Sequence, residues 1–129
     1  MEIKINTTKK FELINITSEI NDLIDIDEGI VNIFTKHSTS AIVVNENESG
    51  LIKDFERLLK DLILEDNGYN HDKIDNNAAS HLRSFLLSAS ETIPIKNSKL
   101  DLGTWQSVFF VELDGPRNNR TIEITTISK

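Results

Sequence analysis

Apolar and polar residues alternate along much of the chain with the period of β-strands. Near both ends, isoleucines alternate with polar residues, which predicts strands with one buried face. Two internal stretches are rich in β-branched residues, and one near the C-terminus is apolar on both faces, as in deeply buried strands. Together they predict about seven or eight strands, with the clearest at residues 2–8, 11–16, 29–35, 41–44, 92–95, 108–111 and 121–127.

A helical spacing of apolar residues predicts three helices, at residues 17–27, 49–66 and 76–88. The second has a broad apolar stripe suited to cover a sheet. The third is expected to turn its apolar residues inward, namely Ala78, Ala79, Leu82, Phe85 and Leu86. Gly29 is expected to end the first helix. The pattern therefore predicts an α+β fold built on antiparallel strands.

Length and composition narrow the class of protein. The chain has 129 residues, enough for a single domain with its own core, predicted here to span residues 1–129. Its formal net charge of −7 argues against a nucleic-acid or anionic-membrane partner. It contains no cysteine, so any metal site must use histidine, carboxylate or amide ligands. No apolar run approaches the ~20 residues that cross a bilayer, and no signal-peptide core is present, so we expect a cytoplasmic protein.

The stretch from His37 to Glu46 combines a buried strand with polar residues at both ends. Ser38 and Thr39 offer hydroxyl and backbone donors that could hold phosphate oxygens, although hydroxyl runs are also common in turns. Glu46 could act as a general base or a metal ligand. Alternatively, its carboxylate favours the N-terminus of the following helix. The residues alone leave both alternatives open.

Three histidines are candidates for a metal site: His37, His71 and His81. His81 follows Asn77 by four residues and shares its helix face, which also looks back toward His71. Three converging imidazoles could bind zinc with one position left open, but the spacing matches no compact metal motif and by itself favours scattered surface or capping histidines. Arg117 and Arg120 flank a predicted turn, where they could clamp an anion or form surface ion pairs.

Six short segments identify a resemblance. They are His37-Ser38-Thr39-Ser40-Ala41, Asn45-Glu46-Asn47, Tyr69-Asn70-His71-Asp72, Ala79-Ser80-His81-Leu82, Leu102-Gly103-Thr104-Trp105-Gln106 and Asp114-Gly115-Pro116-Arg117. In this order they resemble the YjbQ-like family, known also as secondary thiamine-phosphate synthases. The resemblance implies a β-sandwich with helices that assembles as a homotrimer, with Trp105 and residues 108–111 at subunit contacts. It also implies a metal at the three histidines, zinc or alternatively magnesium. The asparagines before Arg120 depart from the family pattern and leave the role of that arginine open.

The activity that the resemblance implies joins a thiazole phosphate to a pyrimidine methyl pyrophosphate and releases pyrophosphate. A metal at the histidines, together with Arg117 and the donors of Ser38 and Thr39, would then stabilise the developing negative charge of the leaving group. Glu46 would handle a proton or orient a histidine. Two alternatives stay open. The first is a metal-dependent phosphoester hydrolase, and the second is a non-catalytic trimeric protein that binds a phosphorylated metabolite.

Overall fold

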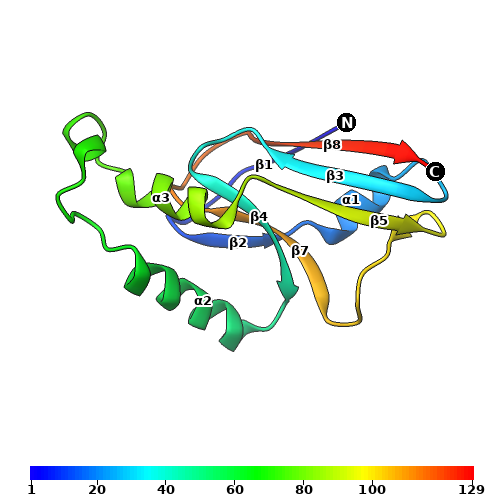
Figure 1. The fold of residues 1–129 in the computed structure, drawn as a ribbon, viewed down its shortest axis with the longest axis horizontal. Coiled ribbons are helices and arrows are strands. Elements are labelled where there is room, and N and C mark those ends of the chain that lie inside the picture. The colour runs from blue at the N-terminus through cyan, green and yellow to red at the C-terminus, as the bar shows by residue number, and fades with distance from the viewer.

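The computed structural model describes all of residues 1–129 and contains two antiparallel sheets (Figure 1). The five-stranded sheet has the order β1-β8-β3-β5-β6 and the three-stranded sheet the order β2-β7-β4. The strands are β1 (Glu2–Ile5), β2 (Glu12–Asn15), β3 (Gly29–Thr35), β4 (Ser40–Glu46), β5 (Ser90–Lys96), β6 (Lys99–Leu100), β7 (Gln106–Glu112) and β8 (Arg120–Ser128). The α+β prediction with antiparallel sheets is confirmed.

The main core lies between the two sheets. The larger sheet contributes β-branched residues such as Val31, Ile33, Ile122 and Ile124, all fully buried. The predicted run at 108–111 forms most of β7, the central strand of the smaller sheet, and is buried on both faces. One face of this strand meets the larger sheet and the other meets a helix. Residues 108–111 are therefore core residues of this chain, and their predicted place at a subunit contact is wrong.

The helix that covers the outer face of the smaller sheet is α2 (Ser49–Leu62). Its residue Leu59 joins Ala41, Val111 and Leu113 in a second apolar cluster. The residue that caps the start of this helix is Glu48, whose carboxylate accepts hydrogen bonds from the backbone N–H groups of Gly50 and Leu51. These bonds hold the pKa of the Glu48 carboxyl below its ordinary value. Glu48, and not Glu46, therefore carries the helix-capping interaction.

Helix α1 (Thr17–Leu23) is shorter than predicted, and Gly29 does not end it, since the C-cap residue is Ile24. Gly29 is instead the first residue of β3 and has a positive φ. A Cβ at this position would lie 2.0 Å from the carbonyl oxygen of Ile127 in the neighbouring strand. The glycine is thus required by a close approach between strands rather than by a helix end.

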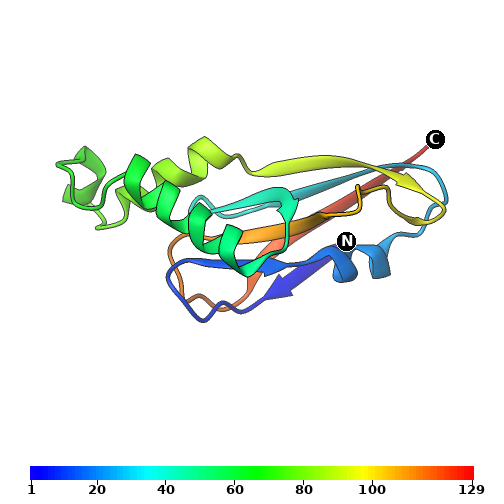
Figure 2. The same cartoon turned by 90° about the horizontal axis from the view of Figure 1, so that it is seen from below.

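Helix α3 (Ala78–Leu87) follows a short 3-10 turn, η1 (Asn70–Lys73), and packs against β4, where the Ser84 hydroxyl donates to the Ser40 carbonyl. Figure 2 shows the connection between α2 and α3, which contains η1, extending past the ends of the strands. Ala78 and Ala79 are buried as predicted. Leu82, Phe85 and Leu86 are exposed, so the predicted inward face is wrong in its second half. The arginine between them, Arg83, is buried and donates to the Ile63 carbonyl and to Glu65, which ties α3 to the end of α2.

Trp105 lies in the loop between β6 and β7 with 73% of its surface exposed. The adjacent Gln106 turns back on this loop, where its amide oxygen accepts a hydrogen bond from the Gly103 N–H at 2.8 Å. No helix of the structure is long and apolar enough to span a membrane.

Candidate functional site

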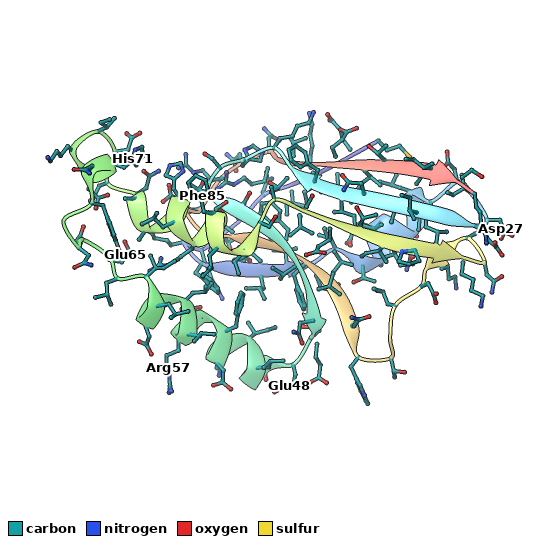
Figure 3. All side chains as sticks on the ribbon, viewed as in Figure 1. Asp27, Glu48, Arg57, Glu65, His71 and Phe85 are labelled. Atoms are coloured by element: carbon teal, nitrogen blue, oxygen red, sulfur yellow. The ribbon has the colours of Figure 1, made fainter.

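His71 and His81 lie together where η1 meets the start of α3. Their ring centroids are 4.8 Å apart, and the rings stand nearly perpendicular at 81°. His71 is held by the short 3-10 turn and His81 by the first turns of the helix. Figure 3 shows His71 at the end of the molecule that is farthest from Asp27. The structure thus brings together two of the three predicted histidines.

A chain of hydrogen bonds orients the His71 ring. Its Nε2 lies 3.1 Å from Oδ1 of Asn77. The Asn77 side chain in turn donates from Nδ2 to Oδ2 of Asp114 at 3.1 Å. Arg117 closes the chain by donating to the same carboxylate oxygen at 3.0 Å and to the Asp114 carbonyl at 2.9 Å. Residues from two distant parts of the sequence therefore fix one imidazole.

His37, two residues after the end of β3, makes a different contact. Its Nε2 accepts a hydrogen bond of 2.8 Å from the backbone N–H of Thr121 at the start of β8. Burial lowers the pKa of the His37 ring below its ordinary value, and the nearby positive charge of Arg120 lowers it further. His37 is therefore held neutral near neutral pH, with its Nε2 already occupied.

Two hollows meet at His81. The first, of about 350 Å³, is lined by His71, His81, Tyr69 and Asn70 together with apolar residues of α3. The second, of about 360 Å³, is lined by His81 together with His37, Ser38, Ser84 and Ser88. The exposed Phe85 borders both. The three imidazoles thus border two hollows along α3 that share His81 and Phe85.

Thr39 does not face these hollows. It is buried, and its Oγ1 accepts a hydrogen bond of 3.0 Å from Arg120. Arg120 is paired with Glu112, which is fully buried and also accepts from the Thr7 hydroxyl at 2.6 Å. Burial by itself would raise the pKa of the Glu112 carboxyl, but bonds from Arg120, Thr7 and the Asp114 amide outweigh it and lower the pKa. The open question about Arg120 is answered: it is a core ion pair.

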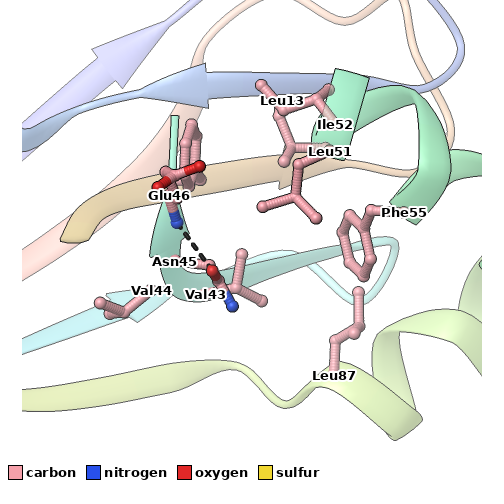
Figure 4. Close-up of a pocket in the computed structure, with 10 residues that line it drawn as sticks. Leu13, Val43, Val44, Asn45, Glu46, Leu51, Ile52, Phe55 and Leu87 are labelled. Atoms are coloured by element: carbon pink, nitrogen blue, oxygen red, sulfur yellow. Dashed lines mark hydrogen bonds between the residues drawn. The ribbon is translucent and has the colours of Figure 1, made fainter. Parts of the chain in front are cut away.

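Glu46 also lies away from the histidines of the same chain. It ends β4, while His37 precedes the start of that strand, and seven strand residues span roughly 20 Å. Glu46 borders a separate cavity of about 260 Å³ between α2 and the smaller sheet (Figure 4). That cavity is lined mostly by apolar side chains such as Leu51, Phe55 and Leu87. Within one chain, Glu46 therefore cannot act on a proton at the histidines.

The side chains do not form the predicted metal site as they stand. No group of three or more histidine, cysteine, aspartate or glutamate side chains is arranged to hold a metal ion. His37 uses its Nε2 to accept from Thr121, and Nε2 of His71 faces an amide oxygen. A ligating imidazole must direct a free lone pair at the metal. The zinc and magnesium hypotheses stay predictions, and no chemical step is derived through a metal.

Four residues at or beside the site were not among the predicted functional residues. Asn77 and Asp114 orient His71, and Ser84 and Ser88 line the second hollow, although the Ser84 hydroxyl already donates to the Ser40 carbonyl. The sequence carries a signal for Asn77, because it lies one helical turn before His81. Asp114 gives no such signal, since a turn aspartate is common and its partner is 37 residues away.

Comparison with known proteins places the whole chain in one family. The family model described as UPF0047 protein YjbQ-like matches residues 1–129. A UPF0047 protein of Methanothermobacter thermautotrophicus is 52% identical over 122 residues, covering 92% of this chain and 85% of that protein. One of Archaeoglobus fulgidus is 41% identical, covering 95% and 97%.

Solved structures agree. A YbjQ-like protein from Sulfolobus solfataricus superposes with a TM-score of 0.96 at 39% identity, covering 100% of this chain and 96% of that one. A yjbq/upf0047 family protein from Clostridium acetobutylicum gives 0.93 at 30% identity, covering 98% and 99%. These matches extend over the sheets, the helices and the histidine segments alike. The chain therefore belongs to the YjbQ-like family of UPF0047 proteins.

Proposed function

We propose that this protein is an enzyme acting on a phosphorylated small molecule, with its reaction centre at the imidazoles around His81. The observation that carries the proposal is the pair of hollows that meet at this residue, lined by three histidines and several hydroxyls. Polar groups converging on a concave site of this size are typical of small-molecule sites. The cavity of about 260 Å³ beside α2 is lined mostly by apolar side chains and by no histidine or hydroxyl residue.

The reaction that the family resemblance suggests joins a thiazole phosphate to a pyrimidine methyl pyrophosphate. A bond forms between the thiazole nitrogen and the pyrimidine methylene carbon, while the bond from that carbon to the pyrophosphate oxygen breaks. The electron pair of the broken bond leaves with pyrophosphate. The protein's task is to stabilise this departing negative charge, which needs hydrogen-bond donors fixed in place before the reaction.

The second hollow has donors suited to that task. The proton of the neutral His37 ring lies on Nδ1, because Nε2 accepts from Thr121. Ser38 and Ser88 add hydroxyls from two further positions. Thr39 has no part in this proposal, because its hydroxyl accepts from the buried Arg120. Arg117 contributes through Asp114, which its Nε and Nη2 already contact.

We also propose that the protein assembles with copies of itself, as the homotrimer that the resemblance implies. Leu51, Leu58 and Leu62 of α2 leave apolar surface exposed, as does Trp105. A row of large exposed apolar side chains is typical of an interaction surface. Light scattering of the purified protein tests this: a mass of three chains is expected, and a monomer would contradict it.

The activity is tested by mixing the protein with the two phosphorylated precursors and measuring both pyrophosphate and the joined product. The wild-type protein should release the two in equal amounts. His81→Ala should reduce the rate of product formation by about a hundredfold. Glu46→Gln should leave that rate unchanged, because Glu46 lies away from the histidines of its own chain. Elemental analysis of the same samples tests the metal prediction, since one bound metal per chain, lost in His81→Ala, would support it.

Other outcomes favour the alternatives. Release of inorganic phosphate from a single phosphorylated substrate, without a joined product, would favour a phosphoester hydrolase. Saturable binding of pyrophosphate with no turnover would favour a metabolite-binding protein. Either result would contradict the synthase proposal.

A further inference from the structure

The side chain of Asn77 is diverted from the role that its position would normally give it. Asn77 is the N-cap residue of α3, where asparagine usually accepts a hydrogen bond from the helix backbone. Its side chain makes no such bond. Asp72 takes its place, with Oδ1 accepting from the Ala78 N–H at 3.0 Å. The amide of Asn77 is thereby left free to join His71 to Asp114.

The direction of each bond in this chain is fixed by Asp114. A carboxylate oxygen only accepts, and Oδ2 of Asp114 accepts both from Arg117 and from Asn77. The NH₂ group of Asn77 must therefore face Asp114, so its carbonyl oxygen Oδ1 must face His71. An amide oxygen also only accepts, which means that Nε2 of His71 carries a proton.

His37 has the opposite arrangement. A backbone N–H only donates, so Nε2 of His37 is the acceptor in its bond with Thr121. When both rings are neutral, His37 carries its proton on Nδ1 and His71 carries its proton on Nε2. The Nδ1 atoms of the two rings are then a donor and an acceptor, respectively. Both rings border the hollows that meet at His81.

We propose that the protein holds His37 and His71 in opposite tautomers, and that Asn77 is the positioning residue for His71. Arg117 and Asp114 keep the Asn77 amide in the required orientation. His37 then donates a hydrogen bond to bound ligand from Nδ1, and His71 accepts one at Nδ1. The use of these two groups in turnover rests on the proposed function, whereas the tautomers themselves do not.

The test is long-range ¹H–¹⁵N NMR of the imidazole rings in the full-length protein at a pH where they are neutral. The expected spectrum shows His37 protonated at Nδ1 and His71 at Nε2. The same tautomer on both rings, or His71 protonated at Nδ1, would overturn the proposal.

Asn77→Ala should change the ring nitrogen shifts of His71 and leave those of His37 in place. It should lower kcat by about tenfold with little change in KM. Asn76→Ala, one residue earlier and exposed, is the matched control and should change neither ring. Unchanged His71 shifts in Asn77→Ala would overturn the role given to Asn77. If the tautomers are as stated but the wild-type protein has no turnover, only the proposed function fails.

Discussion

Two arginine–carboxylate pairs lie within nine residues of one another, and their surroundings give them different roles. Glu112 and Arg120 are 0% and 5% exposed and lie in the core. Asp114 and Arg117 lie at the surface, where the arginine side chain is 51% exposed. The turn that carries both pairs passes close to the loop between β1 and β2, since a Cβ on Gly115 would lie 2.2 Å from the Lys9 carbonyl oxygen.

The difference shows that the contacts of a charge pair, and not its residue types, decide what it does. The buried pair finds further partners inside the fold: Glu112 accepts from Thr7 and the Asp114 amide, and Arg120 donates to Thr39. The surface pair instead passes its orientation on to Asn77 and from there to His71. One pair holds the strands together, and the other arranges the candidate site.

The largest expected effect follows from breaking the buried pair. Glu112→Gln removes the negative charge but leaves the Arg120 guanidinium buried without its counter-charge. We expect the free energy of unfolding to fall by about 3 kcal/mol, since removing one member of a buried pair typically costs 3–5 kcal/mol. Urea unfolding followed by circular dichroism measures this. Glu28→Gln, whose carboxylate is exposed and only 3.8 Å from Lys129, is the control and should change little. A loss equal to that of the control would contradict the role of the pair.

The pH dependence of the free energy of unfolding should separate the contribution of the buried Glu112 from that of His37. The pKa of Glu112 is lowered from 4.5 and that of His37 from 6.5. In both cases the unfolded chain binds the proton more readily, so stability rises with pH across each window. The contribution of His37 should be complete above pH 6.5 and decline below it, and that of Glu112 should decline below pH 4.5. Unfolding free energies measured from pH 8 to pH 4 test this, and His37→Gln should remove the upper step. Stability that increases on acidification through pH 6.5 would contradict the account.

The sequence predicts the strands well because alternation and β-branched runs are local signals. It also predicts α2, because the helical spacing of apolar residues is a local signal too. It fails for Gly29, whose conformation depends on a strand nearly a hundred residues later. It also fails for Thr39 and Glu46, since hydroxyls and carboxylates beside a buried strand look alike whether they face the core, a cavity or solvent. The orientation of His71 depends on Asp114, which no local pattern connects to it.

A smaller effect on stability is expected for the surface pair. Arg117→Met should lower the free energy of unfolding by less than ~1 kcal/mol, because exposed ion pairs contribute little. It should still reduce turnover, since Asp114 loses one of the partners that hold it. Parallel unfolding and pyrophosphate-release measurements separate the two effects. A stability loss as large as that of Glu112→Gln would place Arg117 in the same class as Arg120.

The smallest effect is expected for Lys10. Its Nζ lies 4.0 Å from the other oxygen of Asp114, and its side chain is 54% exposed. Lys10→Ala should change the free energy of unfolding by less than about 0.5 kcal/mol and leave turnover unchanged. A marked loss of turnover would show that Asp114 is held by more than Asn77 and Arg117.

The division between the two pairs is tested most directly by the rate of pyrophosphate release in Asp114→Asn. This change keeps the shape of the side chain but removes the carboxylate that orients both Arg117 and Asn77. We expect the rate to fall by about tenfold, while the free energy of unfolding changes by less than ~1 kcal/mol. A rate equal to that of the wild-type protein would contradict the conclusion that this pair arranges the site.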